Sequence, residues 1–228
     1  MLELKHITKV FRTQDMETYA IDDVSLDIGK GEFVSIMGQS GCGKSTLLNI
    51  AGLLDEPTEG KIVLDGQNVE DLDDKGKAFI RNRKIGFIFQ SFHLISSLNI
   101  IDNVMLPLTF RDDISHSKAR EKAESLLETV GLAHRMHHFP AQLSGGQCQR
   151  AAIARALVTD PEIILADEPT GNLDSRNSTE IMELLKKLNS SGKTILMVTH
   201  SDEIARYTGR TVTMADGHLS DSIKTASL

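Results

Sequence analysis

The sequence has no tryptophan, two tyrosines, two cysteines and five prolines among its 228 residues. Cys42 and Cys148 are too few for a disulfide framework, and residues 1–6 lack the charged and apolar regions of a signal peptide. We therefore expect a reduced, cytoplasmic protein. Its longest apolar runs, such as Ile163–Ala166 and Ile195–Val198, are far shorter than the roughly 18–20 residues of a membrane-spanning helix, so we expect no such helix.

Positive charge is also scarce, since 25 Lys and Arg residues stand against 32 Asp and Glu residues and leave a net charge of −7. An excess of negative charge opposes nonspecific binding to nucleic acid and to anionic lipid, so we expect no nucleic-acid partner. In contrast, 40% of the residues are hydrophobic, which is enough for a buried core. At roughly 100–200 residues per domain, the length predicts a single domain, 1–228, with room for a small subdomain.

Three zones of different periodicity follow one another along the chain. Residues 2–66 contain short alternating or β-branched stretches, which predict β-strands. Residues 92–158 turn helical, and within Ser117–Val130 the apolar side chains recur along one stripe opposite charged ones. From Glu162 onward, short apolar strands alternate with a helix, which is typical of βαβ units and a parallel sheet. The sequence thus predicts an α/β fold, with a frayed polar tail from about Ser220.

A glycine-rich run at residues 38–45, GQSGCGKS, fits the phosphate-binding pattern G-x-x-x-x-G-K-[ST]. It lies between an apolar strand at 33–37 and a helical run at 44–54, the context in which this pattern binds nucleotides. Glycines let successive N–H groups turn inward, and with the positive helix N-terminus these groups bind the β-phosphate. We expect Lys44 to contact the β- and γ-phosphates and the Ser45 hydroxyl to ligate Mg²⁺. An ordinary glycine-rich turn is the alternative.

Two acids, Asp167 and Glu168, directly follow the apolar strand Ile163–Ala166. Ligands of open α/β sheets bind at the carboxyl ends of strands, so both acids are expected near the phosphate-binding loop. We expect Asp167 to hold Mg²⁺ through water and Glu168 to polarise the attacking water as general base. Acids that merely end a strand before Pro169 are the alternative, which the upstream loop disfavours.

A helix is predicted to begin at Ser144 and to run to about Val158, because Ser144 and Gln147 fit the capping box S-x-x-Q. Gly145 and Gly146 in its first turn cost about 1 kcal/mol each in helix propensity, and they are easier to understand if an anion approaches the backbone closely. A serine hydroxyl and free N–H groups at a positive helix end suit a γ-phosphate. A capped helix without a ligand is the alternative.

These motifs, in this order and followed by a lone histidine, His200, after a strand, resemble the ATP-binding-cassette (ABC) ATPases over essentially the whole chain. The resemblance implies a P-loop NTPase core with a parallel sheet, an N-terminal antiparallel β subdomain and an inserted α-helical subdomain. The core and the β subdomain would comprise about 1–90 and 159–228, and the helical subdomain would comprise about 91–158.

The resemblance also implies a head-to-tail homodimer, in which each ATP lies between one chain's phosphate-binding loop and the other chain's Ser144 helix. Gln90 matches a glutamine that senses Mg²⁺ and links the core to the helical subdomain. Asp174 matches an acid that touches the opposite protomer. His200 matches a histidine that contacts the γ-phosphate and positions the water and the base.

In this family, adenine stacks on an aromatic ring near the N-terminus, where Phe11 matches in position and Tyr19 is a possible substitute. The residues expected at the nucleotide are Phe11, Gly38, Ser40, Gly41, Cys42, Gly43, Lys44, Ser45, Thr46, Ser144, Gly145, Gly146, Gln147 and Asp174. Those expected to carry the chemistry are Lys44, Gln90, Glu168 and His200, and those expected to hold Mg²⁺ are Ser45, Gln90 and Asp167.

The implied reaction is ATP hydrolysis by in-line attack of water, with catalysis by positioning and charge neutralisation. Opening and closing of the dimer would drive separate integral-membrane permease subunits, which would hold the chain on the inner face of the cell membrane. The apolar residues after Gln90, such as Phe92, Leu94, Ile95 and Leu98, either line the groove that receives the permease or pack between subdomains.

Residues 38–49 and 166–174 look most like the branch that serves lipoprotein release, macrolide export and the division-associated cassette. We therefore expect export or extraction of a hydrophobic, lipid-linked or antimicrobial compound. Regulation of cell-envelope or division enzymes is the alternative. A soluble ABC ATPase that acts on nucleic acid is less favoured, because 228 residues leave no room for long coiled coils or tandem cassettes and the acidic balance opposes such a partner. A module that binds ATP without hydrolysing it is less favoured, because Glu168 and His200 are both present.

Overall fold

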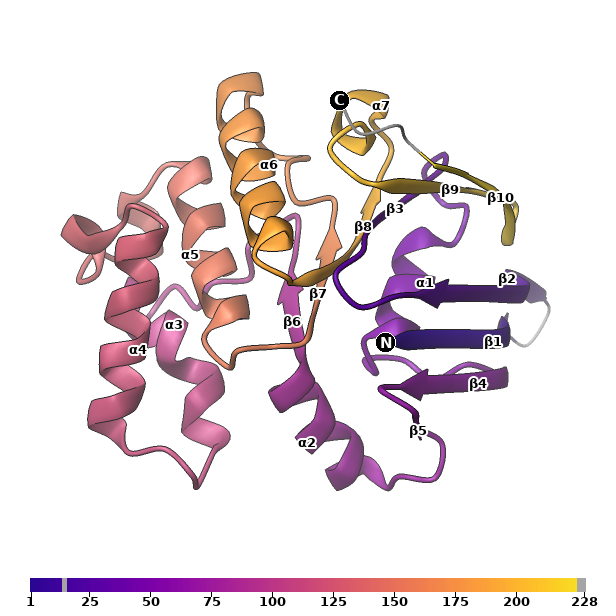
Figure 1. The fold of residues 1–228 in the computed structure, drawn as a ribbon, viewed down its shortest axis with the longest axis horizontal. Helices are drawn as coiled ribbons and strands as arrows, with labels where there is room; N and C mark the ends of the chain where they lie inside the picture. Colours follow the sequence, from indigo (N-terminus) through magenta and orange to yellow (C-terminus); the bar gives the residue numbers. More distant parts are fainter. Residues whose placement is uncertain (14–15, 225–228) are drawn as a thin grey trace.

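Two β-sheets and their flanking helices make up the computed structural model, which describes residues 1–13 and 16–224 (Figure 1). The first sheet is antiparallel and has the order β2-β1-β4-β5. Its strands are β1 (Leu2–Arg12), β2 (Glu17–Ile28), β4 (Glu59–Leu64) and β5 (Gln67–Asn68). The second sheet has the order β10-β9-β3-β8-β7-β6 and is parallel except where β10 pairs with β9. Its strands are β3 (Phe33–Met37), β6 (Ile85–Ile88), β7 (Ile163–Asp167), β8 (Thr194–Thr199), β9 (Arg210–Ala215) and β10 (His218–Lys224).

The central strands are continuous apolar runs because both of their faces are covered. Every residue of β8 is buried, as is every residue of β7 except the last. One face packs against α1 (Lys44–Ala51) and the antiparallel sheet. The other face packs against α5 (Gly145–Leu157) and α6 (Ser175–Ser190). This arrangement confirms the expected α/β fold with an N-terminal antiparallel sheet.

Three helices lie together to one side of the parallel sheet (Figure 1) and share a third apolar core. It is built from α3 (Ile100–Met105), α4 (His116–Thr129) and α5. The expected stripe of α4 is confirmed, since Ala119, Ala123 and Leu127 are buried in this core. The remaining helical elements are α2 (Asp74–Lys84), α7 (Asp202–Ala205), η1 (Leu106–Phe110), η2 (Ala133–Arg135) and η3 (Pro140–Gln142). The subdomain boundaries given above remain predictions.

The expected frayed tail from Ser220 is wrong as far as Lys224, because β10 pairs with β9. The turn between the two strands contains Asp216 and Gly217, both with positive φ. Asp-Gly in this conformation is a strong hairpin signal. The part of the expected tail at residues 225–228 lies outside the described residues.

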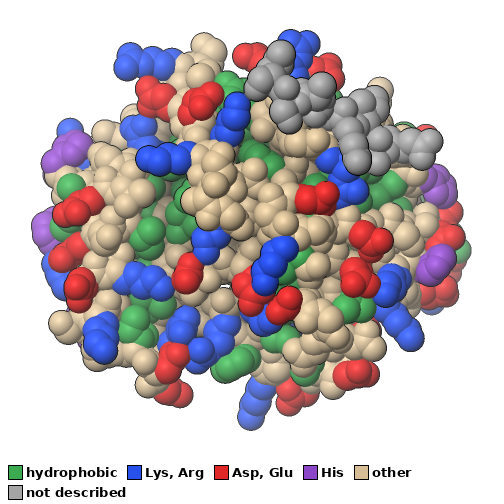
Figure 2. Space-filling view, in the orientation of Figure 1, with side chains coloured by type: hydrophobic (Ala, Val, Ile, Leu, Met, Phe, Trp, Pro, Cys, Tyr) green, Lys and Arg blue, Asp and Glu red, His purple; other side chains and the backbone are tan. Residues whose placement is uncertain are grey.

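Within the described ranges, no helix is long and apolar enough to cross a membrane, and the longest, α6, has 16 residues. On the face drawn in Figure 2, acidic and basic side chains are interspersed. Any ligand that approached this face would therefore meet charges of both signs.

Candidate functional site

The phosphate-binding loop connects the end of β3 to the start of α1 and is held tightly on two sides. A Cβ at Gly38 would overlap the carbonyl oxygen of Met214 on β9. A Cβ at Gly43, whose φ is +103°, would overlap the carbonyl oxygen of Ala20 on β2. Both positions therefore require glycine, and the loop is fixed between the two sheets before any ligand binds.

Lys44 is the charged residue of this loop, and its side chain is almost completely buried. Its Nζ donates hydrogen bonds to the carbonyl oxygens of Gly38 and Gln39, at 2.8 and 2.6 Å. At the start of α1, the N-cap residue Gly43 supplies no side-chain cap, so first-turn N–H groups keep their hydrogen-bonding capacity. A fixed cation and free N–H groups at one helix end are what binding of phosphate requires.

The Ser45 hydroxyl and the Asp167 carboxylate meet at the end of β7. The Ser45 Oγ donates to Asp167 Oδ1 at 2.9 Å. Burial raises the pKa of Asp167, and the repulsion from Glu168 adds to this, while the hydrogen bond from Ser45 and the charge of Lys44 oppose it. A divalent cation would relieve the burial penalty by stabilising the ionised form.

The oxygen donors at this point fit Mg²⁺, which usually binds through one or two protein ligands together with substrate phosphates and waters. Ser45 and Asp167 provide two such oxygens, and the Gln90 side chain lines the same cavity. Within residues 1–13 and 16–224, no group of three or more His, Cys, Asp or Glu side chains could hold a metal by itself.

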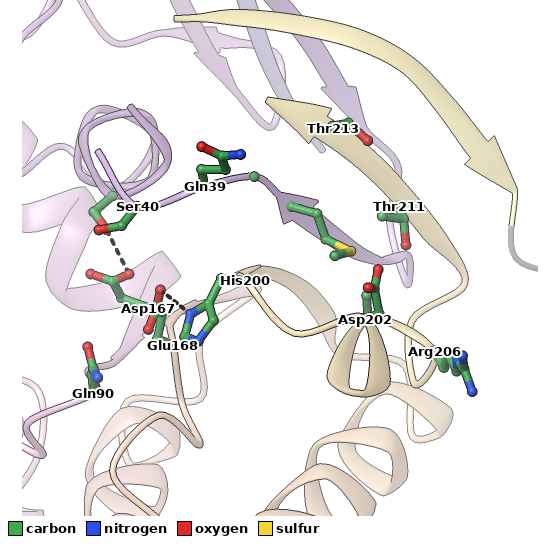
Figure 3. Close-up of a pocket in the computed structure, with 14 residues that line it drawn as sticks. Gln39, Ser40, Gln90, Asp167, Glu168, His200, Asp202, Arg206, Thr211 and Thr213 are labelled. Carbon is green, nitrogen blue, oxygen red and sulfur yellow. Dashed lines mark hydrogen bonds and ion pairs between the residues drawn. The ribbon is translucent and has the colours of Figure 1, made fainter. Parts of the chain in front are cut away.

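Glu168 and His200 form a second pair beside the first (Figure 3). Nδ1 of His200 lies 2.9 Å from Oε1 of Glu168. Because an ionised carboxylate only accepts hydrogen bonds, this contact places the imidazole proton on Nδ1 and leaves Nε2 available. Glu168 has a φ of +42°, a conformation uncommon for residues with a side chain, so the backbone is set specifically to aim this carboxylate.

A cavity of about 1130 Å³ collects these groups at the carboxyl ends of β3, β7 and β8 (Figure 3). Seven of the expected residues line it: Gly38, Ser40, Ser45, Gln90, Asp167, Glu168 and His200. Gly41, Cys42, Gly43, Lys44 and Thr46 belong to the same loop and the first turn of α1. Gln39, Asp202, Arg206, Thr211 and Thr213 also line the cavity and were not singled out from the sequence.

Gln90 is held in the cavity by the loop that follows β7. The Asn172 side chain donates to the Gln90 carbonyl oxygen at 3.0 Å, and Gln90 Nε2 lies 3.4 Å from Asn172 Oδ1. A Cβ at Gly171 would come within 2.6 Å of Gln90 Nε2, so a side chain at this position would displace the Gln90 amide. The loops after β6 and β7 are thus interlocked next to the carboxylates.

The predicted capping box at the start of α5 is confirmed. The Gln147 backbone N–H donates to Ser144 Oγ at 3.3 Å, and the Ser144 N–H donates to Gln147 Oε1 at 3.0 Å. The close neighbour of Gly146, however, belongs to the same chain, because a Cβ there would overlap Oδ1 of Asn177 on α6. The side-chain packing of α6 therefore accounts for this glycine without an anion.

The Ser144–Gln147 turn does not line the cavity that holds Glu168 and His200. Asp174 is also absent from its lining and caps α6, accepting from the Asn177 N–H at 2.8 Å. This hydrogen bond, with one from the Asn177 side chain, lowers the pKa of Asp174. One copy of the chain therefore does not bring the expected γ-phosphate contact at Ser144 to the rest of the site.

A side chain of α5 reaches the loop that follows β7 in its own chain. Nε2 of Gln149, which is completely buried, donates to the carbonyl oxygen of Pro169 at 2.5 Å. Pro169 directly follows Glu168 in the sequence. The helix that begins at Ser144 is thus bonded to the peptide next to the candidate base.

The two aromatic candidates for adenine stacking lie on the β1–β2 hairpin beside the loop. Phe11 is 47% exposed and Tyr19 is 57% exposed, so both rings have free faces. Lys9 Nζ lies 5.3 Å from the centre of the Phe11 ring. Neither ring lines the main cavity, and the choice between them remains a prediction.

The apolar residues after Gln90 were expected either to line the permease groove or to pack between subdomains, and they do not all behave alike. Leu94 packs against the core of the helical segment, whereas Ile95 is 41% exposed. None of Phe92, Leu94, Ile95 and Leu98 lines the second large cavity, which has a volume of about 1010 Å³. That cavity lies between α2, β6, η1 and α5 instead, and we call it the α2–α5 groove.

The sequence profile described as "ABC transporter" matches residues 21–171. An uncharacterized ABC transporter ATP-binding protein, MJ1508, of Methanocaldococcus jannaschii is 48% identical over 98% of this chain and 99% of its own length. The macrolide export ATP-binding/permease protein MacB of Chlorobaculum tepidum is 51% identical over 98% of this chain, but the match spans only 34% of MacB.

A solved structure supports the same relationship. The dimeric post-hydrolysis state of the ATP-binding cassette MJ0796, bound to ADP and Pi, superimposes with a TM-score of 0.92. It is 47% identical to this chain, and the match covers 100% of both chains.

Proposed function

This chain belongs to the ABC transporter family as an ATP-hydrolysing, nucleotide-binding subunit, and we propose which of its residues bind ATP, which carry out the hydrolysis and how the energy leaves the site. The main support is the meeting of Lys44, the Ser45–Asp167 pair and the Glu168–His200 pair at one edge of the sheet. Each of these groups has a separate task in phosphoryl transfer.

The loop and α1 bind the phosphates in this proposal. Lys44 and the free N–H groups of α1 neutralise the phosphate oxygens. Ser45, Asp167 and Gln90 hold Mg²⁺, which, when bound, neutralises charge on the transferred phosphoryl group. The hydrogen bond from Asn172 holds the Gln90 backbone in place beside the carboxylates.

Glu168 and His200 handle the attacking water in this proposal. Glu168 accepts the proton from the water as the oxygen attacks the γ-phosphorus. The His200 N–H group at Nδ1 donates to the Glu168 carboxylate and holds it in place beside the attacking water. In-line attack from this side breaks the bond between the γ-phosphorus and the β–γ bridging oxygen, and this oxygen stays on the β-phosphate of ADP.

The γ-phosphate contact is completed by a second copy of the chain. Ser144 is capped at the start of α5 but does not line the cavity of its own chain, and the similar MJ0796 cassette is dimeric. We infer a head-to-tail homodimer in which each Ser144 helix covers the other chain's ATP and Asp174 touches the opposite protomer. ATP then stabilises the closed dimer, and hydrolysis releases it.

A pair of lysine variants tests the hydrolytic assignment. Lys44→Ala removes the buried cation of the loop, and we expect ATP turnover to fall by at least about 100-fold. Lys61→Ala removes an exposed lysine on β4, far from the loop in the sequence, and serves as the matched control. Phosphate release at saturating ATP measures both. Turnover by Lys44→Ala at the level of Lys61→Ala would contradict the assignment.

The α2–α5 groove is the site at which we propose that the permease docks. Phe79 and Phe110 line it with 59% and 76% of their surfaces exposed. Among its charged residues, Lys75, Arg81, Arg83, Arg111 and Arg155 outnumber Asp112 and Asp113, although the whole chain is acidic. An apolar helical segment of the permease that carries an acidic residue fits this lining.

Arg155 gives the groove a connection to the nucleotide site. Its Nη2 donates to the Phe92 carbonyl oxygen at 2.7 Å, and its Nη1 donates to that of His93. These residues follow Gln90 by two and three positions. Binding of the permease in the groove would therefore affect the position of the segment that carries Gln90.

A phenylalanine variant tests the docking site. Phe110→Asp places a carboxylate in the groove, and we expect co-purification of the permease from solubilised membranes to fall at least about tenfold, through loss of apolar contact and repulsion of the acidic segment. Phe139→Asp, at a 45% exposed position outside the groove, is the control. Equal recovery of an integral-membrane protein with both variants would exclude the groove.

We further propose that the complete transporter exports or extracts a hydrophobic, lipid-linked or antimicrobial compound and that its permease holds this chain on the inner face of the membrane. Support comes from the similarity to a macrolide export protein whose printed name joins an ATP-binding part to a permease. Because the chain spans about a third of that protein, the compound is selected by the permease and is identified by transport assays on the complete assembly.

A further inference from the structure

A smaller cavity of about 240 Å³ lies on the other side of the Glu168–His200 pair. Among the described residues, these two are the only ones that line both this cavity and the nucleotide cavity. The pair therefore forms the wall between the two spaces. The rest of the smaller cavity comes from the loop after β7, the first turns of α6 and the region around α7.

The lining of the smaller cavity is rich in hydroxyl groups. Six of its residues are serine or threonine and one is Tyr207. Within the described part of the chain, the hydroxyls of Ser178 and Tyr207 make no hydrogen bond to protein, and Thr179 uses its hydroxyl only to donate to the Ser175 carbonyl oxygen at 3.0 Å. Water supplies the missing partners of such groups.

The size and the charge of the cavity favour water over an anion. At about 30 Å³ per molecule, its volume admits about eight waters. Two carboxylates, Glu168 and Glu203, line it, and both repel phosphate. Glu203 is exposed to solvent, so the cavity reaches from the candidate base to the surface.

We propose that this cavity is a water-filled proton route that carries the proton from Glu168 to solvent beside Glu203. The inference rests on the proposed role of Glu168 as base. When the water oxygen bonds to the γ-phosphorus, the bond to the β–γ bridging oxygen breaks and one water proton passes to the carboxylate. The proton then moves along the waters and hydroxyls, which regenerates the ionised base with no change of oxidation state.

The route matters because the other side of the base is closed during hydrolysis. In the proposed dimer, the partner's helix covers the nucleotide cavity, whereas the small cavity extends away from the nucleotide to the exposed Glu203. Ser178, Thr179 and Tyr207 act here as positioning residues for water and do not touch the substrate.

A filling variant tests the route. Ser178→Leu places an apolar side chain where the half-buried Ser178 lines the cavity. We expect kcat to fall about tenfold, a change of about 1.4 kcal/mol in the barrier, and the solvent deuterium isotope effect on kcat to rise, because proton departure becomes slower. ATP affinity should be unchanged. Ser190→Leu, at an exposed position of the same helix that lines neither cavity, is the matched control.

A second variant keeps the shape of the cavity, and it tests the proton route if Ser178→Leu does not fold. Thr179→Val together with Tyr207→Phe removes two hydroxyls, and we expect a fall of about threefold in kcat with the same rise in the isotope effect. Wild-type kcat, or a lower kcat with an unchanged isotope effect, would overturn the proposal. Failure of the proposed function is distinct, because the wild-type chain would then hydrolyse no ATP or Glu168→Gln would leave turnover intact.

Discussion

The edge of the parallel sheet and the start of α5 contribute to the same chemistry in different ways. At the sheet edge, Lys44, Ser45 and Asp167 are already bonded to their neighbours within one chain. At α5, the capped turn at Ser144 is equally well formed but is not part of its own chain's cavity. Under the proposed function, one copy of the chain is therefore complete in fold but incomplete as a catalyst.

The strongest challenge to this comparison is a mixture of two defective chains. Ser144→Arg should reduce hydrolysis by at least about 100-fold while leaving ATP binding to the isolated chain nearly unchanged, because the serine acts on the partner's nucleotide. Mixed with Lys44→Ala, it should recover part of the turnover, since one composite site per mixed dimer is intact. Phosphate release from each variant and from the mixture measures this. A mixture as inactive as its components would contradict sharing of the site.

A smaller effect separates packing from ligand binding at α5. Gly146→Ala should destabilise the chain by about 1–3 kcal/mol, because the new methyl group overlaps Asn177 Oδ1. Adding Asn177→Ala should recover part of the loss by removing the obstacle, beyond the independent cost of that change. Urea unfolding of the single and double variants without nucleotide measures it. Additive losses would show that the contact with Asn177 is not the reason for the glycine.

The smallest expected effect concerns the sheet edge without ligand. The pKa of Asp167 is raised from 3.8, chiefly by burial, so the ionised carboxylate is penalised in the folded state. The contribution of the Asp167 carboxyl to stability is fully present below its ordinary pKa, and it is lost as the pH rises through the raised pKa of the folded state. Asp167→Asn should therefore give a modest rise in Tm at neutral pH that disappears in acid. Thermal unfolding at both pH values checks it, and a lower Tm at neutral pH would contradict the assigned cause.

The sequence was most informative where the function depends on a short run of neighbouring residues. The loop around Lys44, the acids Asp167 and Glu168, and the capping box at Ser144 all lie where local patterns predict them. Each of these patterns encodes a turn or a strand end, which is determined by residues close in the chain.

The parts that escaped prediction depend on contacts between distant segments. Thr211 and Thr213 line the cavity only because β9 is placed next to β3, which no local pattern reveals. The contact between Gly146 and Asn177 joins positions 31 residues apart, so no local pattern predicts it. The β10 strand could have been found, since Asp216 and Gly217 carry a hairpin signal.

The hydrogen bond from Gln149 to Pro169 has a consequence for timing. In the proposed dimer, the Ser144 end of α5 contacts the neighbour's ATP, and five residues later the same helix is bonded next to the candidate base of its own chain. A tilt that withdraws the first end must strain the second. The two sites of a dimer would then not hydrolyse ATP independently, because a movement of α5 at one site would be transmitted to the other.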